Sequence, residues 1–257
     1  MSFINHLSRS LAVSALTLIT APALAQDGGP PDGGWTVGLF GFSNETAYGF
    51  KDNAAVPMVE YENEYFKLGV PSVEVKLPWL SSENLSFGVT VDLFGAEGGY
   101  KASDAAILHG MAERKSGVWA GAIMNWENEV VDLSFKALRD AGGDSKGSSF
   151  EVEASRSFFV GERFMITPSL TATRLDAKTV DYYYGVRASE ATAGRAAYTG
   201  SATVNVKAGV NFGYMLTESQ MLMLDISATK LGSGIADSPI AVDDTLTSVG
   251  LGYMFRF

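Results

Sequence analysis

The stretch that decides the fold is the C-terminal "TSVGLGYMFRF", residues 247–257. Counted in steps of two, it separates into an apolar row and a row of small or polar residues. The apolar row is Val249, Leu251, Tyr253, Phe255 and Phe257, and the other is Ser248, Gly250, Gly252, Met254 and Arg256. Because a β-strand sends successive side chains to opposite faces, this pattern predicts a strand with one apolar face.

The first residues have the pattern of a secretory signal peptide. Residues 1–9 carry one formally cationic side chain, residues 11–20 form an apolar run too short to span a bilayer, and Ala23-Leu24-Ala25 is a small-x-small cleavage motif. We therefore expect cleavage after Ala25. Residues 26–34 would then form a flexible, acidic N-terminus outside the cytoplasm.

Composition narrows the protein class. The formal net charge of −10 disfavours nucleic acid as a partner, and the absence of cysteine excludes disulfides from an exported fold. After residue 25, no stretch reaches the roughly 18 to 20 apolar residues of a membrane-spanning helix. Two classes remain, a periplasmic β-sandwich and a transmembrane β-barrel.

The same alternation recurs in residues 85–93, 131–137, 203–214 and 222–228, and the connections favour the barrel. Short polar turns and long loops alternate along the second half of the chain, as periplasmic turns and outer loops do in outer-membrane barrels. We expect long loops at residues 43–53, 96–116, 141–147, 177–200 and 231–244. Aromatic residues near strand ends are typical of membrane-interface girdles. They are Phe158, Phe159, Phe164, Tyr214, Tyr253, Phe255 and Phe257.

We predict an all-β fold, a transmembrane antiparallel β-barrel of the bacterial outer membrane over residues 35–257. It has about 12 strands, or about 10 if the short pieces within residues 56–78 do not span the bilayer. Pro168 has no N–H for the ladder, so we expect a local bulge there. The expected strands are residues 35–42, 56–61, 65–70, 72–78, 85–94, 117–125, 130–138, 148–159, 164–175, 201–215, 221–230 and 247–257.

The polar faces of these strands predict a narrow lumen that contains both signs of charge. The side chains expected to point inward are Asp92, Asp132, Lys136, Glu151, Glu153, Lys207 and Asp225. Opposite charges can pair and fill a narrow barrel, whereas barrels with an open aqueous channel have about 16 to 18 strands. General diffusion is therefore the weaker hypothesis, and a narrow or gated path stays an alternative.

Catalytic and metal-binding patterns are weak. His6 leaves with the signal peptide, and His109 lies in an expected loop with Ser103, Asp104 and Glu113 nearby in sequence but with no fixed geometry. A solvated loop histidine is the favoured reading, so no catalytic residue is predicted. No zinc-type spacing is present, and the acidic residues Asp237, Asp243 and Asp244 have no EF-hand spacing. We predict no cofactor and no metal.

The most distinctive loop is "DYYYGVRASEATAGRAAY", residues 181–198. Its aromatic and charged residues would suit a protein contact, because such side chains dominate interface hot spots. Alternatively, the loop folds back and its tyrosines plug the barrel mouth. The candidate interaction residues are Tyr182, Tyr183, Tyr184, Gly185, Arg187, Glu190 and Arg195.

These blocks resemble the MipA/OmpV family of outer-membrane proteins, the MltA-interacting proteins. The similarity is carried by the Tyr-Tyr-Tyr-Gly-Val block, by "ADSPI" at residues 236–240, by the terminal strand and by "PMVEYENEYFKLG" at residues 57–69. Residues 96–116 do not resemble the family closely. The positions that match are Tyr182, Tyr183, Tyr184, Gly185, Val186, Ser189, Glu190, Arg195, Asp237, Ser238 and Pro239.

The resemblance implies a non-enzymatic scaffold that brings a lytic murein transglycosylase together with a penicillin-binding protein. Such partners would meet the short turns or residues 26–34. The alternatives are a narrow solute channel, a barrel for surface adhesion or antibiotic response, and, less favoured, a lipid hydrolase that uses His109. Further expected partners are outer-membrane lipids, lipopolysaccharide and the barrel-assembly machinery of a Gram-negative cell, with Tyr253, Phe255 and Phe257 as the assembly signal.

Overall fold

The computed structural model describes residues 33–95 and 97–257, and it shows one closed antiparallel barrel. The ring closes because β11 pairs with β12 on one side and with β10 on the other. Of the thirteen strands, β8 and β9 pair with the same neighbour, β10, and form two halves of one strand. The prediction of a barrel with about 12 strands is therefore confirmed. The expected signal peptide lies outside the described residues.

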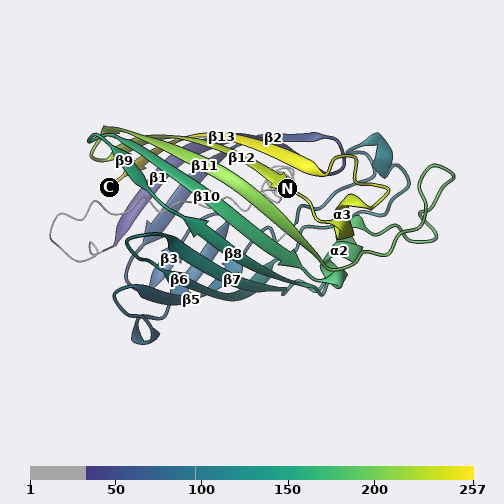
Figure 1. Cartoon of the computed structure of the whole chain (residues 1–257), viewed down its shortest axis with the longest axis horizontal. Coiled ribbons are helices and arrows are strands. Elements are labelled where there is room, and N and C mark those ends of the chain that lie inside the picture. Colours follow the sequence, from purple (N-terminus) through teal and green to yellow (C-terminus); the bar gives the residue numbers. More distant parts are fainter. Residues whose placement is uncertain (1–32, 96) are drawn as a thin grey trace.

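The strands follow the chain as a meander, in which each strand pairs with the next (Figure 1). Within the described ranges, no helix is both long enough and apolar enough to cross a membrane. The helices are η1 (Pro78–Leu80), η2 (Ala106–Leu108), α2 (Ala177–Tyr184) and α3 (Ser233–Ala236). The strands are β1 (Gly34–Glu45), β2 (Lys51–Glu62), β3 (Phe66–Leu68), β4 (Ser72–Lys76), β5 (Leu85–Asp92), β6 (Trp119–Trp126), β7 (Asp132–Asp140), β8 (Ser148–Ser155), β9 (Phe158–Val160), β10 (Phe164–Leu175), β11 (Thr203–Thr217), β12 (Gln220–Lys230) and β13 (Thr245–Arg256).

The terminal strand β13 has the two faces that its sequence predicts. Leu251 points outward and is 62% exposed, whereas Gly250 and Gly252 are buried on the inner face. A Cβ atom at Gly250 would run into the ring of Phe40, so glycine makes room for this ring against the inner wall. The outward apolar row is therefore the lipid-facing surface, and the glycine row lines the lumen.

The two ends of the barrel differ. The strands are joined by short turns at the end where the chain terminates, and α2 and α3 lie at the opposite end (Figure 1). Since outer-membrane barrels have short periplasmic turns and longer outer loops, we assign the first end to the periplasm. The predicted aromatic residues gather at that end, so they form one girdle and not two. The exposed members are Phe158, Phe159, Tyr214, Tyr253 and Phe257.

The expected long loop at residues 43–53 is wrong. β1 and β2 stay paired up to Glu45 and Lys51, and only a tight turn at residues 46–50 separates them. Thr46 closes the turn, because its amide and its hydroxyl both donate to the carbonyl of Phe50, at 3.0 and 2.9 Å. Gly49 supplies the positive φ of +81° that the reversal requires.

The bulge expected at Pro168 is also wrong. Ser155 pairs with Ser169 and Phe158 pairs with Ile166, so the register is the same on both sides of the break between β8 and β9. Between these pairs, the amide of Arg156 donates to the carbonyl of Pro168 at 3.3 Å, and proline has no N–H to return the bond. Pro168 therefore interrupts the ladder without shifting it.

The lumen has a polar wall, formed mainly by β5 to β11, which carries all of the predicted inward charges except Asp225 of β12. Lys136 pairs with Asp92 at 2.6 Å, Thr171 donates to Glu153 at 2.9 Å, and Thr173 donates to Glu151. The opposite wall is apolar, which the sequence analysis missed. It consists of the buried side chains Phe40, Phe42, Val56, Met58 and Met223, from β1, β2 and β12. Charge pairing therefore fills only half of the lumen.

Candidate functional site: the outer cap

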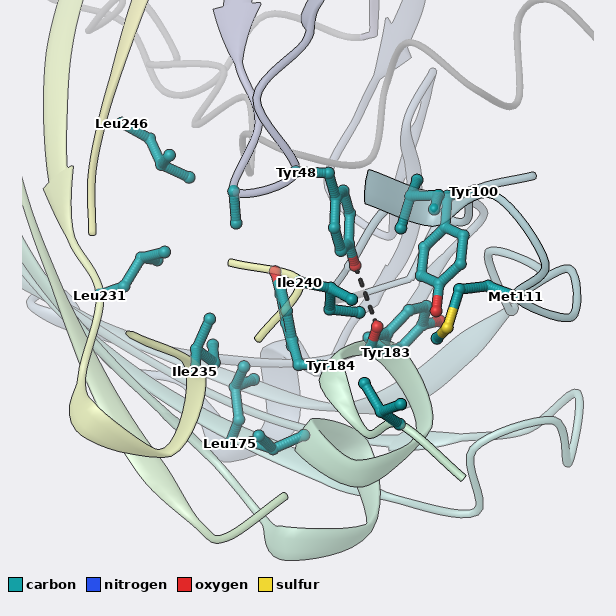
Figure 2. Packing of buried hydrophobic residues seen from close by; sticks show 14 residues of the cluster. Tyr48, Tyr100, Met111, Leu175, Tyr183, Tyr184, Leu231, Ile235, Ile240 and Leu246 are labelled. Atoms are coloured by element: carbon teal, nitrogen blue, oxygen red, sulfur yellow. Dashed lines mark hydrogen bonds between the residues drawn. The ribbon is translucent and has the colours of Figure 1, made fainter. Parts of the chain in front are cut away.

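The connections at the end opposite the C-terminus fold together into one unit, which we call the outer cap. It comprises residues 46–50, 97–117, 176–202 and 231–244, and it packs on the inward-facing ends of β10, β12 and β13 (Figure 2). The cap has a hydrophobic core of its own. Its buried members are Ala47, Tyr48, Tyr100, Leu108, Met111, Leu175, Val180, Tyr183, Tyr184, Val186, Leu231, Ile235, Ile240 and Leu246. The outer mouth of the barrel is thus covered by packed side chains.

Helix α2 carries the tyrosine block into this core. Asp176 caps its N-terminus by accepting from the amide of Thr179 at 2.9 Å. At the other end, a Cβ atom on Gly185 would collide with the carbonyl of Asp181, so the helix ends where only glycine fits. The helix directs Tyr183 and Tyr184 inward, and both are buried.

The two blocks that carry the family resemblance contact each other. The hydroxyl of Ser238 donates to the backbone carbonyl of Tyr184 at 2.6 Å, although 54 residues separate them. The ring of Tyr48 stacks on Tyr184 with centroids 5.5 Å apart, and its hydroxyl donates to the carbonyl of Tyr183 at 3.1 Å. Asp237 stays exposed. The sequence motif is therefore the packing surface of the cap.

A buried ion pair joins two segments of the cap. Arg114 and Glu190 lie 3.0 Å apart, and their side chains are only 1% and 5% exposed. Glu190 also accepts from the amides of Ala112 at 2.9 Å and of Arg187 at 3.0 Å. Burial alone would raise the pKa of Glu190, but the bonds from Arg114 and these two amides lower that pKa to about 2. Glu190 is therefore ionised across the physiological range.

Arg195 adds a second connection between the same segments. Its guanidinium donates to the carbonyl of Glu190 at 2.7 Å and to that of His109 at 3.1 Å. Arg114 in turn donates to the carbonyl of Tyr182 at 2.7 Å. Carbonyl groups that would otherwise be buried without donors are thereby satisfied, so the two arginines and Glu190 form one network.

The chain was compared with known proteins. Residues 37–257 match the family model described as "MltA-interacting protein MipA". The chain belongs to the MipA family. It is 24% identical to "Putative outer membrane protein YiaT" of Escherichia coli (strain K12), over 86% of this chain and 90% of the relative. It is also 24% identical to the outer membrane protein OmpV of Vibrio cholerae serotype O1, over 88% of each chain.

The chain also has a weak likeness to solved structures of outer-membrane proteins. The NanC porin matches with a TM-score of 0.45 and 9% identity, covering 85% of this chain and 98% of the porin. The COG4313 outer membrane channel from Pseudomonas putida F1 matches with a TM-score of 0.43 and 13% identity, covering 91% of this chain and 100% of the channel. This MipA-family chain is an outer-membrane β-barrel.

The predicted interaction residues of this MipA-family barrel divide by exposure. Tyr183, Tyr184, Glu190 and Arg195 are buried in the cap, and Arg187 is exposed. Their burial fits the reading in which the loop folds back over the barrel mouth. A partner contact on the exposed face stays a prediction. Sequence reasoning missed Tyr48, Tyr100, Arg114 and Glu97, because their partners lie far along the chain.

His109 lies on the outside of the cap, and its side chain is exposed. Its predicted neighbours make other contacts: Glu113 pairs with the Lys101 ammonium at 3.5 Å, and Asp104 accepts from the Lys101 amide at 2.7 Å. Among the described residues, no three His, Cys, Asp or Glu side chains gather as metal ligands. The surroundings of His109 therefore give the lipid-hydrolase alternative no support.

Glu97 makes the cap sensitive to pH. It accepts from the Tyr184 hydroxyl at 2.7 Å, and although the residue is partly exposed, desolvation of its carboxyl raises its pKa to about 7. The closed cap then retains a proton that an opened cap, with an ordinary carboxyl pKa of 4.5, would release. The protonated Glu97 therefore contributes fully to the stability of the closed cap below pH 4.5, and this stability is lost as the pH rises through about 7.

We expect cap amides of the wild type to exchange faster at pH 8 than at pH 5, after correction for intrinsic exchange, as measured by hydrogen–deuterium exchange. Glu97→Gln should abolish this difference, because glutamine does not titrate. Glu190 does not add to the difference between pH 5 and pH 8. The stability that its ionised form gives the cap is lost only below pH 4.5, as the pH falls toward its pKa of about 2. An unchanged difference in the glutamine variant would rule Glu97 out as its source.

Proposed function

We propose that this barrel is an interaction platform, which brings a lytic transglycosylase of the MltA type and a penicillin-binding protein together at the inner surface of the outer membrane. The family description names MltA as the partner of MipA. A murein enzyme in the periplasm can reach only the end of the barrel that carries the C-terminus and the short turns. The proposal therefore concerns those turns and not the outer cap.

The observation that carries the proposal is the acidic character of this end. Every short periplasmic turn presents at least one exposed glutamate to the solvent. These residues are Glu64, Glu83, Glu127, Glu129, Glu162 and Glu218. In the same connection as Glu83, Trp79 is the middle residue of η1 and is 73% exposed, so its large aromatic ring could anchor a partner. Arg163 and Arg256 are also exposed at this end, but acidic residues predominate in the turns, and such a rim around an aromatic anchor suits a partner with a basic docking surface.

We expect that neutralising three turn glutamates, Glu64→Gln, Glu127→Gln and Glu218→Gln, will weaken binding of a purified MltA-type transglycosylase about tenfold, since each rim charge contributes up to ~1 kcal/mol. The physical reason is a weaker attraction between the acidic rim and a basic partner. Biolayer interferometry with the barrel in nanodiscs measures the affinity, and binding of the wild type should weaken as salt rises.

The matched control removes three exposed acidic charges from the opposite end, with Glu113→Gln, Asp144→Asn and Asp243→Asn. This variant has the same net charge as the turn variant, so it should bind like the wild type. Equal affinity of all three proteins would show that the acidic turns are not the docking surface. No binding of the wild type to either class of murein enzyme would remove the platform proposal as a whole.

A narrow channel is the second candidate, and the polar wall of the lumen is the observation that favours it. Lys136, Asp92, Glu151 and Glu153 could line an ion path along β5, β7 and β8. The outer cap covers that path on the outside. Single-channel recording in planar bilayers separates the two functions, because a platform with a closed cap gives no conductance steps.

A further inference from the structure

The barrel wall is interrupted between β2 and the hairpin formed by β3 and β4. β2 pairs with β1 along its whole length, from Glu62 to Lys51, but it pairs with β3 only through Tyr61 and Glu62. β3 and β4 have only three and five residues. Within the described part of the chain, residues 53–58 of β2 therefore have a ladder partner on one side only. An open edge inside a membrane barrel requires an explanation.

Two prolines lie at this break. The amide of Asn63 donates to Phe66 across the turn into β3, so odd-numbered residues of β2 direct their backbone groups toward β3. Pro57 belongs to this set, and its nitrogen therefore faces the open edge without a hydrogen to leave unsatisfied. Pro71, at the tip of the hairpin, has none either. An unpaired N–H in hydrocarbon costs several kcal/mol, so each proline lowers the cost of the open edge by one donor, while Asn53 and Ala55 keep theirs.

Apolar side chains lie on both sides of the break. On the lumen side, Val56 and Met58 are buried in the apolar wall with Phe40, and Phe94 packs on the same cluster. Phe94 follows β5, on the far side of the short hairpin, so the apolar cluster continues behind the interruption. On the lipid side, Val59 and Leu93 are exposed. Apolar side chains thus flank the break on its lumen side and on its lipid side.

We propose that this break is a lateral binding site for the hydrocarbon chain of an outer-leaflet amphiphile. The chain would lie along the unpaired part of β2, beyond the hairpin tip that packs on Val59 and Glu60, and would contact Met58 and Phe94. Three kinds of ligand can be considered for such an edge. A water-soluble ligand would meet apolar groups on both sides. A peptide strand would meet an interrupted ladder, because Pro57 and Pro71 supply no N–H. A hydrocarbon chain needs no hydrogen bonds and buries apolar surface.

The test uses the mature wild-type protein refolded into phosphatidylcholine vesicles that carry a diazirine in one acyl chain. After irradiation, mass spectrometry locates the labelled residues. We expect label on the lumen-facing Met58 and Phe94 several-fold above that on Thr171, which is also buried on a lumen face, on β10. Val59 and Leu251, which face the lipid, serve as positive controls.

Two outcomes would overturn the site. One is label confined to outward-facing residues, and the other is equal, low label on Met58 and Thr171. A second variant tests the inner surface: Phe94→Ala removes a ring behind the break and should change the labelling of Met58 while leaving that of Leu251 unchanged. Unaltered labelling of Met58 in this variant would show that Phe94 is not part of the site. Heat modifiability on gels confirms that the variant barrel has folded.

Discussion

Replacing Arg114 by alanine is expected to open the outer cap. The substitution leaves Glu190 ionised and buried without its cation, and breaking a buried ion pair from one side costs about 3–5 kcal/mol. The barrel strands do not depend on this pair, so the loss should be local. Hydrogen–deuterium exchange should show the amides of Ala112 and Val186 losing protection, while the β10–β11 ladder keeps its own.

Two further variants isolate the cause. The double substitution Arg114→Met and Glu190→Met removes both charges and fills similar volume, so it should recover much of the lost protection. Lys101→Ala breaks the exposed pair with Glu113 in the same segment and should change the exchange little. If Arg114→Ala and Lys101→Ala behaved alike, the buried pair would not be what closes the cap.

A charge at Leu251 is expected to destabilise the barrel in the bilayer. Leu251 lies in the middle of β13 on the lipid-facing row, so Leu251→Arg places a cation in hydrocarbon at a cost of about 2–4 kcal/mol. Urea titration of the mature protein in vesicles, followed by tryptophan fluorescence, measures the change in the free energy of unfolding.

The control for this prediction lies on the same strand and the same face. Thr247 is close to the outer rim, where it donates to Glu45, and an arginine at that position can pair with this carboxylate. Thr247→Arg should therefore cost only about 0–1 kcal/mol, because the penalty falls off toward the interface. Equal penalties at positions 247 and 251 would contradict the assignment of this row to the lipid.

The strands were predictable because one physical rule, alternation, applies along most of the wall. Residues 164–175 were predicted with the bounds that β10 has. The first part of β2, Lys-Asp-Asn-Ala-Ala, was missed because these residues are poor strand formers, and their pairing with β1 overrides that propensity. The fold class and the closed topology therefore follow from the sequence, whereas strand ends depend on neighbours.

The cap and the apolar wall were not predictable in the same way. β1 has apolar residues on both faces, so periodicity cannot show that Phe40 and Phe42 line the lumen while Leu39 faces lipid. The pair of Arg114 and Glu190 spans 76 positions and belongs to two irregular loops. No local rule relates such residues. The resemblance located the tyrosine block, and only the fold shows that Ser238 contacts it.

The pairing of β1 with β13 has a consequence for biogenesis. Thr36 lies opposite Arg256, so the seam joins the beginning of the barrel to the end of the chain. β1 is the first strand of the barrel to reach the periplasm, and its partner β13 is the last. Until β13 arrives, the edge of β1 that will pair with it has no hydrogen-bonding partner from that strand. Contacts of such sequence separation form slowly, and exposed edges invite aggregation. The unfolded polypeptide therefore needs a chaperone in the periplasm until β13 can pair with β1.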